Sequence, residues 1–240
     1  MNELSGTTVL ITGAARRIGR TLALAAARAG ADIHLHHGHS IKDAQTVADE
    51  IRRMGHQAWI FQQDLNQPDS EILIEKAWQQ KPFNALVNNA AVFEDDTWDT
   101  TSRASWQRHL EVNLNAPFFL SQAFARQLDG KPGMIVNILD WRALRPGADH
   151  FPYTVSKAAL AALTKSLAVA LAPAIRVNGL ALGAILPPSD GGNSDHILAK
   201  VPAARWATLD EVGNALVYLL SQAGDMTGCI IHLDGGRHLA

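Results

Sequence analysis

Two side chains able to exchange protons, Tyr153 and Lys157, stand four residues apart in the stretch Y-T-V-S-K. A spacing of four places both side chains on one face of a helix, about one turn apart. A nearby ammonium favours the ionised phenol and would lower the pKa of Tyr153 towards neutrality, so the pair could transfer a proton. A surface tyrosine that happens to precede a lysine would look the same in isolation.

A turn rich in small residues, T-G-A-A-R-R-I-G, occupies residues 12–19. Gly13 and Gly19 permit a sharp turn in which backbone N–H groups and a helix N-terminus face a pyrophosphate. Arg16 and Arg17 add fixed positive charge beside it. An ordinary strand-to-helix turn could carry the same glycines, but a turn directly after the first apolar strand favours nucleotide binding.

The second expected strand ends in the polar run I-H-L-H-H-G-H-S. An NAD-binding fold carries an acidic residue at that point to accept from the adenosine ribose, whereas here Asp32 precedes the strand. The side chains that follow are groups able to surround a 2′-phosphate, namely His36, His37, His39 and Ser40. With Arg16 or Arg17 supplying charge, they favour NADPH over NADH. Histidines without cysteine or carboxylate partners are more typical of a strand end than of a metal site, so we expect no metal.

Short apolar runs alternate with longer helical patterns along the chain, and these elements must position the groups above. The expected strands are 8–12, 32–36, 58–62, 85–88, 134–139, 175–180 and 230–233, and the clearest helices are 17–29, 41–54, 102–128 and 153–171. Apolar strands that alternate with helices imply a parallel sheet covered on both faces. We therefore predict an α/β fold with a doubly wound, seven-stranded parallel sheet, Rossmann-like, in a single domain over residues 1–240.

Bulk composition narrows the possible functions. The chain has 240 residues, of which 47% are hydrophobic and 18% charged, and a formal net charge of −2. This balance provides no basic surface, so we expect neither nucleic acid nor a membrane as a partner. Cys229 is the only cysteine, which excludes an internal disulfide. With no cationic leader ahead of the first strand, we expect a cytoplasmic protein. Residues 187–194 are long and polar enough for a substrate lid.

Several short motifs occur in the order found in short-chain dehydrogenases and reductases. Besides the glycine turn and the Tyr153–Lys157 pair, they are N-N-A-A at 88–91, Asn113 in V-N-L-N-A-P, R-V-N at 176–178 and D-G-G at 234–236. Over essentially its whole length the chain resembles this family, which implies a Rossmann-like oxidoreductase. Two departures are Arg17, where the family's turn usually has its middle glycine, and Leu182, where it usually has a proline.

The resemblance also implies a set of cofactor contacts. Asp64 and Leu65 match the pair that contacts adenine, and the segment from Gly183 to Ile185 matches the one that flanks nicotinamide. The residues expected to bind NADPH are Gly13, Arg16, Arg17, Ile18, Gly19, His36, His37, His39, Ser40, Asp64, Leu65, Asn89, Ala90, Tyr153, Lys157, Gly183 and Ile185. Asn113 is expected to position Lys157 through a bound water.

One further departure concerns the residue expected to touch the substrate. The family carries a serine at the end of the fifth strand, and here that strand ends in Asp140. A carboxylate can accept from a heterocyclic N–H or, when protonated, donate to a ring nitrogen. Together with the R-R-I-G turn, Asp140 resembles the pteridine reductases and dihydromonapterin reductases. Phe93 matches the aromatic residue that stacks a pterin against the nicotinamide in those enzymes.

That resemblance implies NADPH-dependent reduction of a pterin, either dihydropterin to tetrahydropterin or oxidised pterin to dihydropterin. The implied catalytic residues are Asn113, Asp140, Tyr153 and Lys157, and the implied substrate contacts are Arg17, Ala91, Phe93, Asp140 and Tyr153. Tyr153 would pass a proton to a ring nitrogen. Phe93 could instead be ordinary core, and Asp140 could be an ion-pair partner of Arg142 or Arg145.

Other functions stay open at the level of sequence. A carbonyl or 3-oxoacyl reductase of the same family would carry a serine in place of Asp140. A non-catalytic NADPH sensor on the same fold would not need Asn113, Tyr153 and Lys157 together. The sequence does not distinguish among pterins or pathways. Helices 102–128 and 153–171 resemble those that pair subunits in this family, so we expect a homotetramer.

Overall fold

Seven strands carry the fold in a computed structural model, which describes residues 3–186 and 195–240. They are β1 (Thr8–Ile11), β2 (Asp32–His37), β3 (Ala58–Gln62), β4 (Ala85–Asn88), β5 (Gly133–Asp140), β6 (Ile175–Leu182) and β7 (Ile230–Leu233). All seven predicted strands are present. Strands β5 and β6 are longer than predicted because they pair with each other along their full length. The expected lid, 187–194, lies outside the described residues.

The sheet reverses its direction of growth between two neighbouring strands. The strand order is β3-β2-β1-β4-β5-β6-β7, and every neighbouring pair is parallel, which confirms the predicted doubly wound sheet. Because β1 lies beside β4, the chain before β4 builds one half of the sheet and the chain after it builds the other. At such a switch point the loops after the two strands diverge and leave a crevice at the carboxyl ends.

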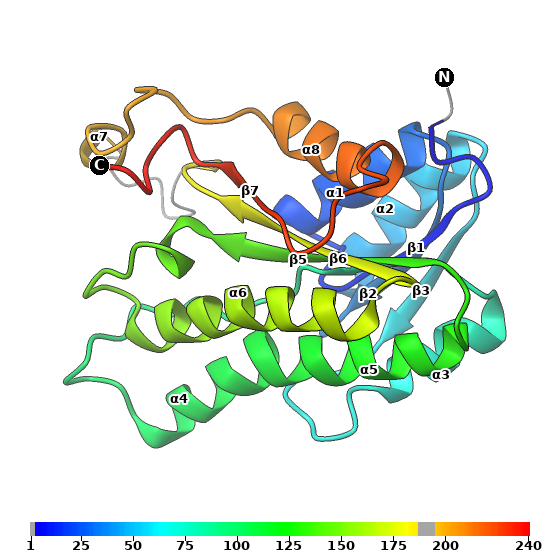
Figure 1. Cartoon of the computed structure of the whole chain (residues 1–240), viewed down its shortest axis with the longest axis horizontal. Coiled ribbons are helices and arrows are strands. Elements are labelled where there is room, and N and C mark those ends of the chain that lie inside the picture. The colour runs from blue at the N-terminus through cyan, green and yellow to red at the C-terminus, as the bar shows by residue number, and fades with distance from the viewer. Residues whose placement is uncertain (1–2, 187–194) are drawn as a thin grey trace.

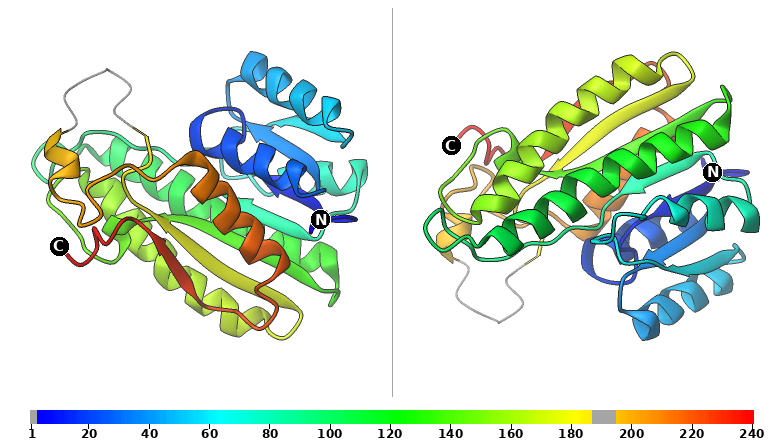
Figure 2. Two further views of the ribbon diagram at one scale, coloured as in Figure 1. Left: turned by 90° about the horizontal axis from the view of Figure 1, so that it is seen from above. Right: turned by 90° about the horizontal axis from the view of Figure 1, so that it is seen from below.

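Helices cover both faces of the sheet (Figures 1 and 2). One layer holds α1 (Arg17–Arg28), α2 (Ile41–Arg53) and α8 (Leu209–Ser221), and the other holds α3 (Ile72–Gln80), α4 (Arg103–Leu110), α5 (Ala116–Leu128) and α6 (Phe151–Leu171). Alternate residues of the strands enter the two cores. Val9 and Ile11 of β1 belong to the core under α1 and α8, whereas Leu10 belongs to the core under α3 and α5.

The long helix predicted over 102–128 contains an irregular segment. Its first part, α4, is followed by a π-helical stretch, Glu111–Asn115, and then by α5, which begins with Pro117 in its first turn. A proline removes a backbone donor, which interrupts the regular hydrogen-bond ladder four residues earlier. Single π-helical turns of this kind occur often at functional sites, and this one contains Asn113.

Helix α6 is unusually apolar for a helix that carries charged chemistry. With 21 residues and a mean hydropathy of 1.3 over its most apolar window, it meets the length and composition of a membrane span. Ten of its residues are buried in the fold, and they include Tyr153, Ser156 and Lys157. We therefore interpret α6 as a core helix that packs on the sheet beside β6.

Candidate active site

The glycine turn lies in the crevice between β1 and β4. The N–H groups of Asn89 and Ala90, directly after β4, both donate to Thr12 Oγ1, at 2.9 and 3.0 Å. The Asn89 side chain donates to the Thr12 carbonyl oxygen at 2.8 Å. Thr12 was not among the predicted site residues, although its hydroxyl joins the two loops of the crevice. A threonine at a strand end next to a glycine turn is the only sequence signal for this role.

Close backbone packing explains the glycines of the turn. A Cβ on Gly19 would lie 2.0 Å from the carbonyl oxygen of Gly13, so no other residue fits there. Gly13 adopts a φ of 63° and approaches Ala90. Arg17, the first residue of α1, has a φ of 49°, a left-handed conformation that costs an L-residue about 1–2 kcal/mol. The fold thus has an arginine at a position whose geometry suits glycine, and the contact of Arg17 with a ligand stays a prediction.

His36 does not have the role that we predicted. It is buried, and its Nδ1 accepts from the Gly13 N–H at 3.1 Å while its Nε2 lies 2.9 Å from the Gln63 carbonyl oxygen. Burial lowers the pKa of His36 to about 4, so the ring is neutral near pH 7. Both ring nitrogens are occupied, which leaves none for a phosphate. We correct its role to that of a residue that shapes the glycine turn.

The other predicted phosphate contacts lie at the end of β2 and at the starts of α1 and α2. His37 is buried at the end of β2, and neither of its ring nitrogens has a hydrogen-bond partner among the described residues. His39 is exposed, and Ser40 precedes α2 without capping it by its side chain. Arg16 is held against α2 by Asp43, with Nε 2.5 Å from the carboxylate. The assignment of these residues to the 2′-phosphate stays a prediction.

The predicted adenine contacts follow β3. Asp64 accepts from the N–H of Asn66 at 3.0 Å and from the Gln67 side chain at 3.3 Å, so its carboxylate stabilises the local turn. Leu65 is buried in the core under α3. The Asp64 carbonyl oxygen also accepts from the Gln67 N–H at 3.2 Å, and the contact of this pair with adenine stays a prediction.

Asp140, Tyr153 and Lys157 meet at the carboxyl end of β5. The Tyr153 hydroxyl donates to Asp140 Oδ2 at 3.3 Å. Lys157, one turn further along α6, donates from Nζ to the Ile138 carbonyl oxygen at 2.7 Å, and its Nζ lies 5.7 Å from the centre of the Tyr153 ring. All three side chains are largely buried. The proximity of these three side chains could be predicted from the sequence, because Asp140 ends β5 and the other two lie on one face of α6.

The protonation states differ from the simple expectation for a tyrosine beside a lysine. Burial raises the pKa of Tyr153 well above its ordinary value, and the charge of Asp140 raises it further. Burial also raises the pKa of Asp140, against the opposing charge of Arg142. The pKa of Lys157 falls to about 8, because burial outweighs the attraction of Asp140. In this state Tyr153 is therefore a neutral phenol, and it can donate a proton rather than accept one.

Asn113 connects the π-helical segment to the catalytic helix. Its Oδ1 accepts from the Val92 N–H at 2.8 Å, and its Nδ2 donates to the Val92 carbonyl oxygen and to Ser156 Oγ, each at 3.0 Å. Ser156 in turn donates to the Tyr153 carbonyl oxygen at 2.7 Å. Asn113 thus fixes the loop after β4 against the start of α6. Its predicted action on Lys157 through water stays a prediction.

Phe93 projects from the loop after β4 and is 54% exposed, which excludes the ordinary core as its role. One side of the ring stacks on His150, with centroids 4.0 Å apart, and its edge meets Tyr153 at 4.7 Å. Ala91 beside it is exposed and offers no hydroxyl. His150 donates from Nδ1 to the Glu94 carbonyl oxygen, 2.8 Å away, so the stack is held in place. The sequence did not point to His150.

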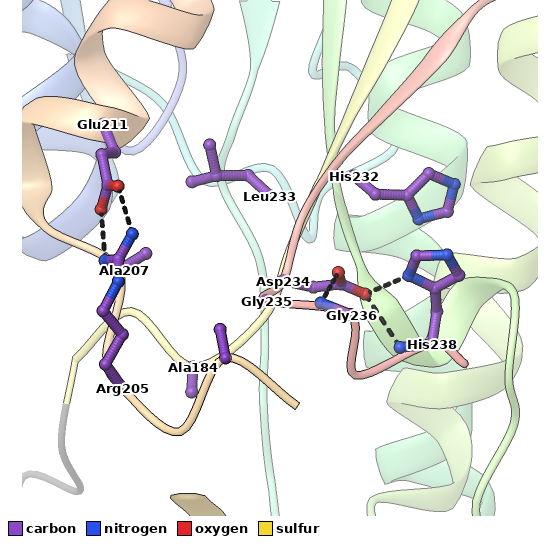
Figure 3. Close-up of a pocket in the computed structure, with 11 residues that line it drawn as sticks. Ala184, Arg205, Ala207, Glu211, His232, Leu233, Asp234, Gly235, Gly236 and His238 are labelled. Atoms are coloured by element: carbon purple, nitrogen blue, oxygen red, sulfur yellow. Dashed lines mark hydrogen bonds and ion pairs between the residues drawn. The ribbon is translucent and has the colours of Figure 1, made fainter. Parts of the chain in front are cut away.

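The segment after β6 lies close to the segment after β7. The N–H of Gly183 donates to the Leu233 carbonyl oxygen at 3.0 Å, and a Cβ on Gly183 would lie 2.5 Å from Asp234 Cα. Ile185 is buried. A pocket of about 340 Å³ lies at this junction. Its lining residues, drawn in Figure 3, include Ala184, Arg205, Glu211, His232, Asp234 and His238. The predicted nicotinamide segment therefore borders a cavity, although its two named residues do not line it.

The crevice fits a dinucleotide by its own geometry. The N–H groups of Ile18 and Gly19, at the start of α1, make no hydrogen bond with the described residues. Unpaired donors at a helix N-terminus bind phosphate. The unpartnered ring of His37 stands at the end of β2. Fold and site together define an oxidoreductase that binds a dinucleotide at a switch point and carries a proton donor next to it.

Comparisons with known proteins identify the family. The model of the enoyl-(acyl carrier protein) reductase family matches residues 13–238. FolM alternative dihydrofolate reductase 1 from Brucella canis, complexed with NADP, is 36% identical with a TM-score of 0.92, over 99% of this chain and 96% of that one. The 2-dehydro-3-deoxy-D-gluconate 5-dehydrogenase of Bacillus subtilis is 34% identical over 98% of this chain and 95% of its own length. A 3-oxoacyl-[acyl-carrier-protein] reductase from Aquifex aeolicus is 32% identical over 98% of each chain.

The chain belongs to the short-chain dehydrogenase/reductase family. It is an NADP-dependent oxidoreductase of that family, as the sequence predicted. The relatives act on different substrates by name, so the family by itself does not fix what is reduced.

Proposed function

We propose that this protein reduces a pterin with NADPH. The observation that carries the proposal is the direct hydrogen bond between Tyr153 and Asp140 at the end of β5. A carbonyl reductase needs a neutral donor to the carbonyl oxygen, whereas a buried carboxyl group suits a substrate with ring N–H groups and ring nitrogens. The similarity to FolM alternative dihydrofolate reductase 1 supports the same substrate class.

The exposed ring of Phe93 supports a flat aromatic substrate. It stands beside Tyr153, and its second face is not used by His150. Aromatic rings gain about 0.5–1.5 kcal/mol from stacking beyond the area they bury. A pterin against this face would bring its ring nitrogens towards Asp140 and Tyr153. Ala91 and Arg17 are the remaining proposed substrate contacts.

The roles of the chain's own groups follow from their protonation states. When bound, NADPH supplies a hydride to a C=N carbon of the ring. Tyr153 is a phenol that can give its proton to the ring nitrogen left negative by that transfer. The Lys157 ammonium stabilises the tyrosinate that remains. The Asp140 carboxyl group can accept hydrogen bonds from the N–H groups of the pterin ring, or it can pass on a proton. The protein therefore positions the substrate, excludes water and supplies one proton.

Reduction of a dihydropterin to the tetrahydropterin is the main proposal, and reduction of an oxidised pterin to the dihydropterin uses the same groups. The alternative is reduction of a carbonyl or 3-oxoacyl substrate, which the Aquifex aeolicus relative favours by its name. A non-catalytic NADPH sensor is the weakest alternative, because it would not need a buried proton donor beside a buried ammonium. We also propose that the enzyme is a cytoplasmic homotetramer with no nucleic-acid or membrane partner.

A substrate panel tests the proposal. NADPH oxidation is measured with dihydrobiopterin, dihydromonapterin and dihydrofolate, and in parallel with a 3-oxoacyl thioester and a keto sugar acid. We expect turnover of at least one dihydropterin and much slower oxidation with the carbonyl substrates. Turnover of a carbonyl substrate alone would replace the proposal by the alternative, and NADPH binding without any turnover would favour the sensor.

A further inference from the structure

A short turn after β7 carries an arginine that the reaction above does not use. Gly235 and Gly236 adopt φ of 62° and 84°, so the chain reverses sharply there. The carboxylate of Asp234, 4% exposed, accepts from the N–H groups of Gly236 and His238, each at 3.0 Å. A turn closed by such bonds has little freedom, and Arg237 lies in the middle of it.

Arg237 lies against Trp141, the residue that directly follows Asp140. Its Cζ is 4.3 Å from the centre of the indole ring. Arg142 approaches the same ring at 4.8 Å and the Phe93 ring at 5.9 Å. Two guanidinium groups and two aromatic rings therefore gather beside the Asp140–Tyr153 pair. A pterin stacked on Phe93 would have its substituent near this group of side chains.

The two arginines differ in their counter-ions. Arg142 is paired with Asp149 at 2.5 Å and with Asp140 at 3.5 Å. Arg237 forms no ion pair or side-chain hydrogen bond with residues 3–186 or 195–240, and its Nε is buried without a partner. Burial lowers the pKa of Arg237, and the charge of Arg142 lowers it further. The charges of Asp140, Asp149 and Asp234 act in the opposite direction, but none of these carboxylates forms an ion pair with Arg237, so its donors remain free for an anion.

We infer that Arg237, stacked on Trp141 at the outer edge of the site, binds a carboxylate carried by the substrate. The inference rests on the proposed pterin reduction and narrows it to pterins whose substituent ends in a carboxylate. Dihydrofolate, with its p-aminobenzoyl-glutamate group, has this chemistry, whereas dihydrobiopterin and dihydromonapterin carry neutral hydroxyalkyl groups. A planar guanidinium matches a carboxylate with two parallel hydrogen bonds, and the indole ring offers an apolar face beside it.

Kinetics with two pterins test the selectivity. We compare kcat/KM for dihydrofolate and for dihydrobiopterin in the wild type, Arg237→Gln, Arg237→Lys and Arg53→Gln. In Arg237→Gln the ratio of dihydrofolate to dihydrobiopterin falls about tenfold or more, the loss expected for one charge-assisted contact. Arg237→Lys retains part of the ratio because its charge remains. Arg53→Gln removes the same charge from the exposed end of α2 and leaves the ratio unchanged.

A binding measurement separates this inference from the proposed function. Calorimetry follows p-aminobenzoyl-glutamate, which lacks the pterin, added to the complex of the enzyme with NADP⁺. Binding in the wild type that is lost in Arg237→Gln supports the carboxylate site even if no pterin is reduced. An unchanged kinetic ratio in Arg237→Gln, or equal binding of this compound to wild type and variant, overturns the inference. Failure of every pterin in the panel with retained binding would reject pterin reduction alone.

Discussion

At the scale of single residues, the site depends on three buried ionisable groups. The charge of Asp140 shifts the pKa of the other two, Tyr153 and Lys157. Asp140 and Tyr153 share a hydrogen bond, and both have a raised pKa, whereas the pKa of Lys157 is lowered to about 8. Desolvation is the main cause in each case. The arrangement therefore provides a protonated donor at neutral pH, and the cation beside it loses its proton as the pH rises through about 8.

The pH dependence of turnover follows from Lys157. Its pKa in the fold, about 8, lies below the ordinary value of 10.5, so the ammonium is lost as the pH rises through about 8. We expect kcat/KM for the pterin to decline above that pH with a slope of one proton. This decline is not caused by unfolding. A lysine whose pKa is lowered in the fold makes the free energy of unfolding rise as the pH goes from about 8 to 10.5. Rates measured across this range, with NADPH affinity as the control, check it. A rate that stays level through pH 8 and well beyond would contradict the role of Lys157.

At the scale of elements, the π-helical segment fixes Asn113 between two loops. Its three hydrogen bonds to Val92 and Ser156 lie at a fully buried position. Replacement of Asn113 by Ala leaves these partners unpaired, and each unpaired buried group costs about 1–3 kcal/mol. We expect Asn113→Ala to lower the free energy of unfolding by about 3 kcal/mol.

Urea denaturation measures this loss. Asn115→Ala is the matched control in the same segment, because Asn115 makes one half-buried bond to Glu111 and should cost only about 0.5–1 kcal/mol. Equal effects of the two substitutions would show that Asn113 does not hold the loops together.

The positions of the strands could be predicted from the sequence, whereas many side-chain contacts between elements could not. Periodicity located all seven strands, and the strand ends then placed the glycine turn, Asp140 and Tyr153 at one edge. Side-chain contacts formed by the fold could not be predicted, since nothing local distinguishes a buried histidine from an exposed one. His36 was assigned to a phosphate, but the register of β2 directs it to Gly13. Arg237 was missed because its neighbour Trp141 is distant in the sequence.

At the scale of the whole molecule, large apolar side chains remain exposed on helices of both layers, including α5 and α6. Phe119 on α5 is 40% exposed and Val169 on α6 is 81% exposed. Because α5 and α6 resemble the helices that pair subunits in this family, we propose that Phe119 and Val169 lie in a subunit interface. We expect light scattering to give a mass of about 104 kDa, four times the 25.9 kDa of one chain.

Phe119→Glu should shift the enzyme to smaller species, because it places a charge in the proposed interface. Exposed Leu144, which lies outside α5 and α6, provides the control substitution Leu144→Glu. A mass near that of one chain for the wild type would reject the tetramer.

The role of Asp140 in pterin reduction is tested most directly by its exchange for the serine that the family usually carries. Asp140→Ser and Asp140→Asn are compared with the wild type for NADPH affinity and for turnover of a dihydropterin. We expect both variants to retain NADPH binding and to lose turnover by about 100-fold or more, as removal of a group that acts on the proton transfer does. Pterin turnover that is unchanged in Asp140→Ser would contradict the assignment of pterin chemistry to this carboxyl group.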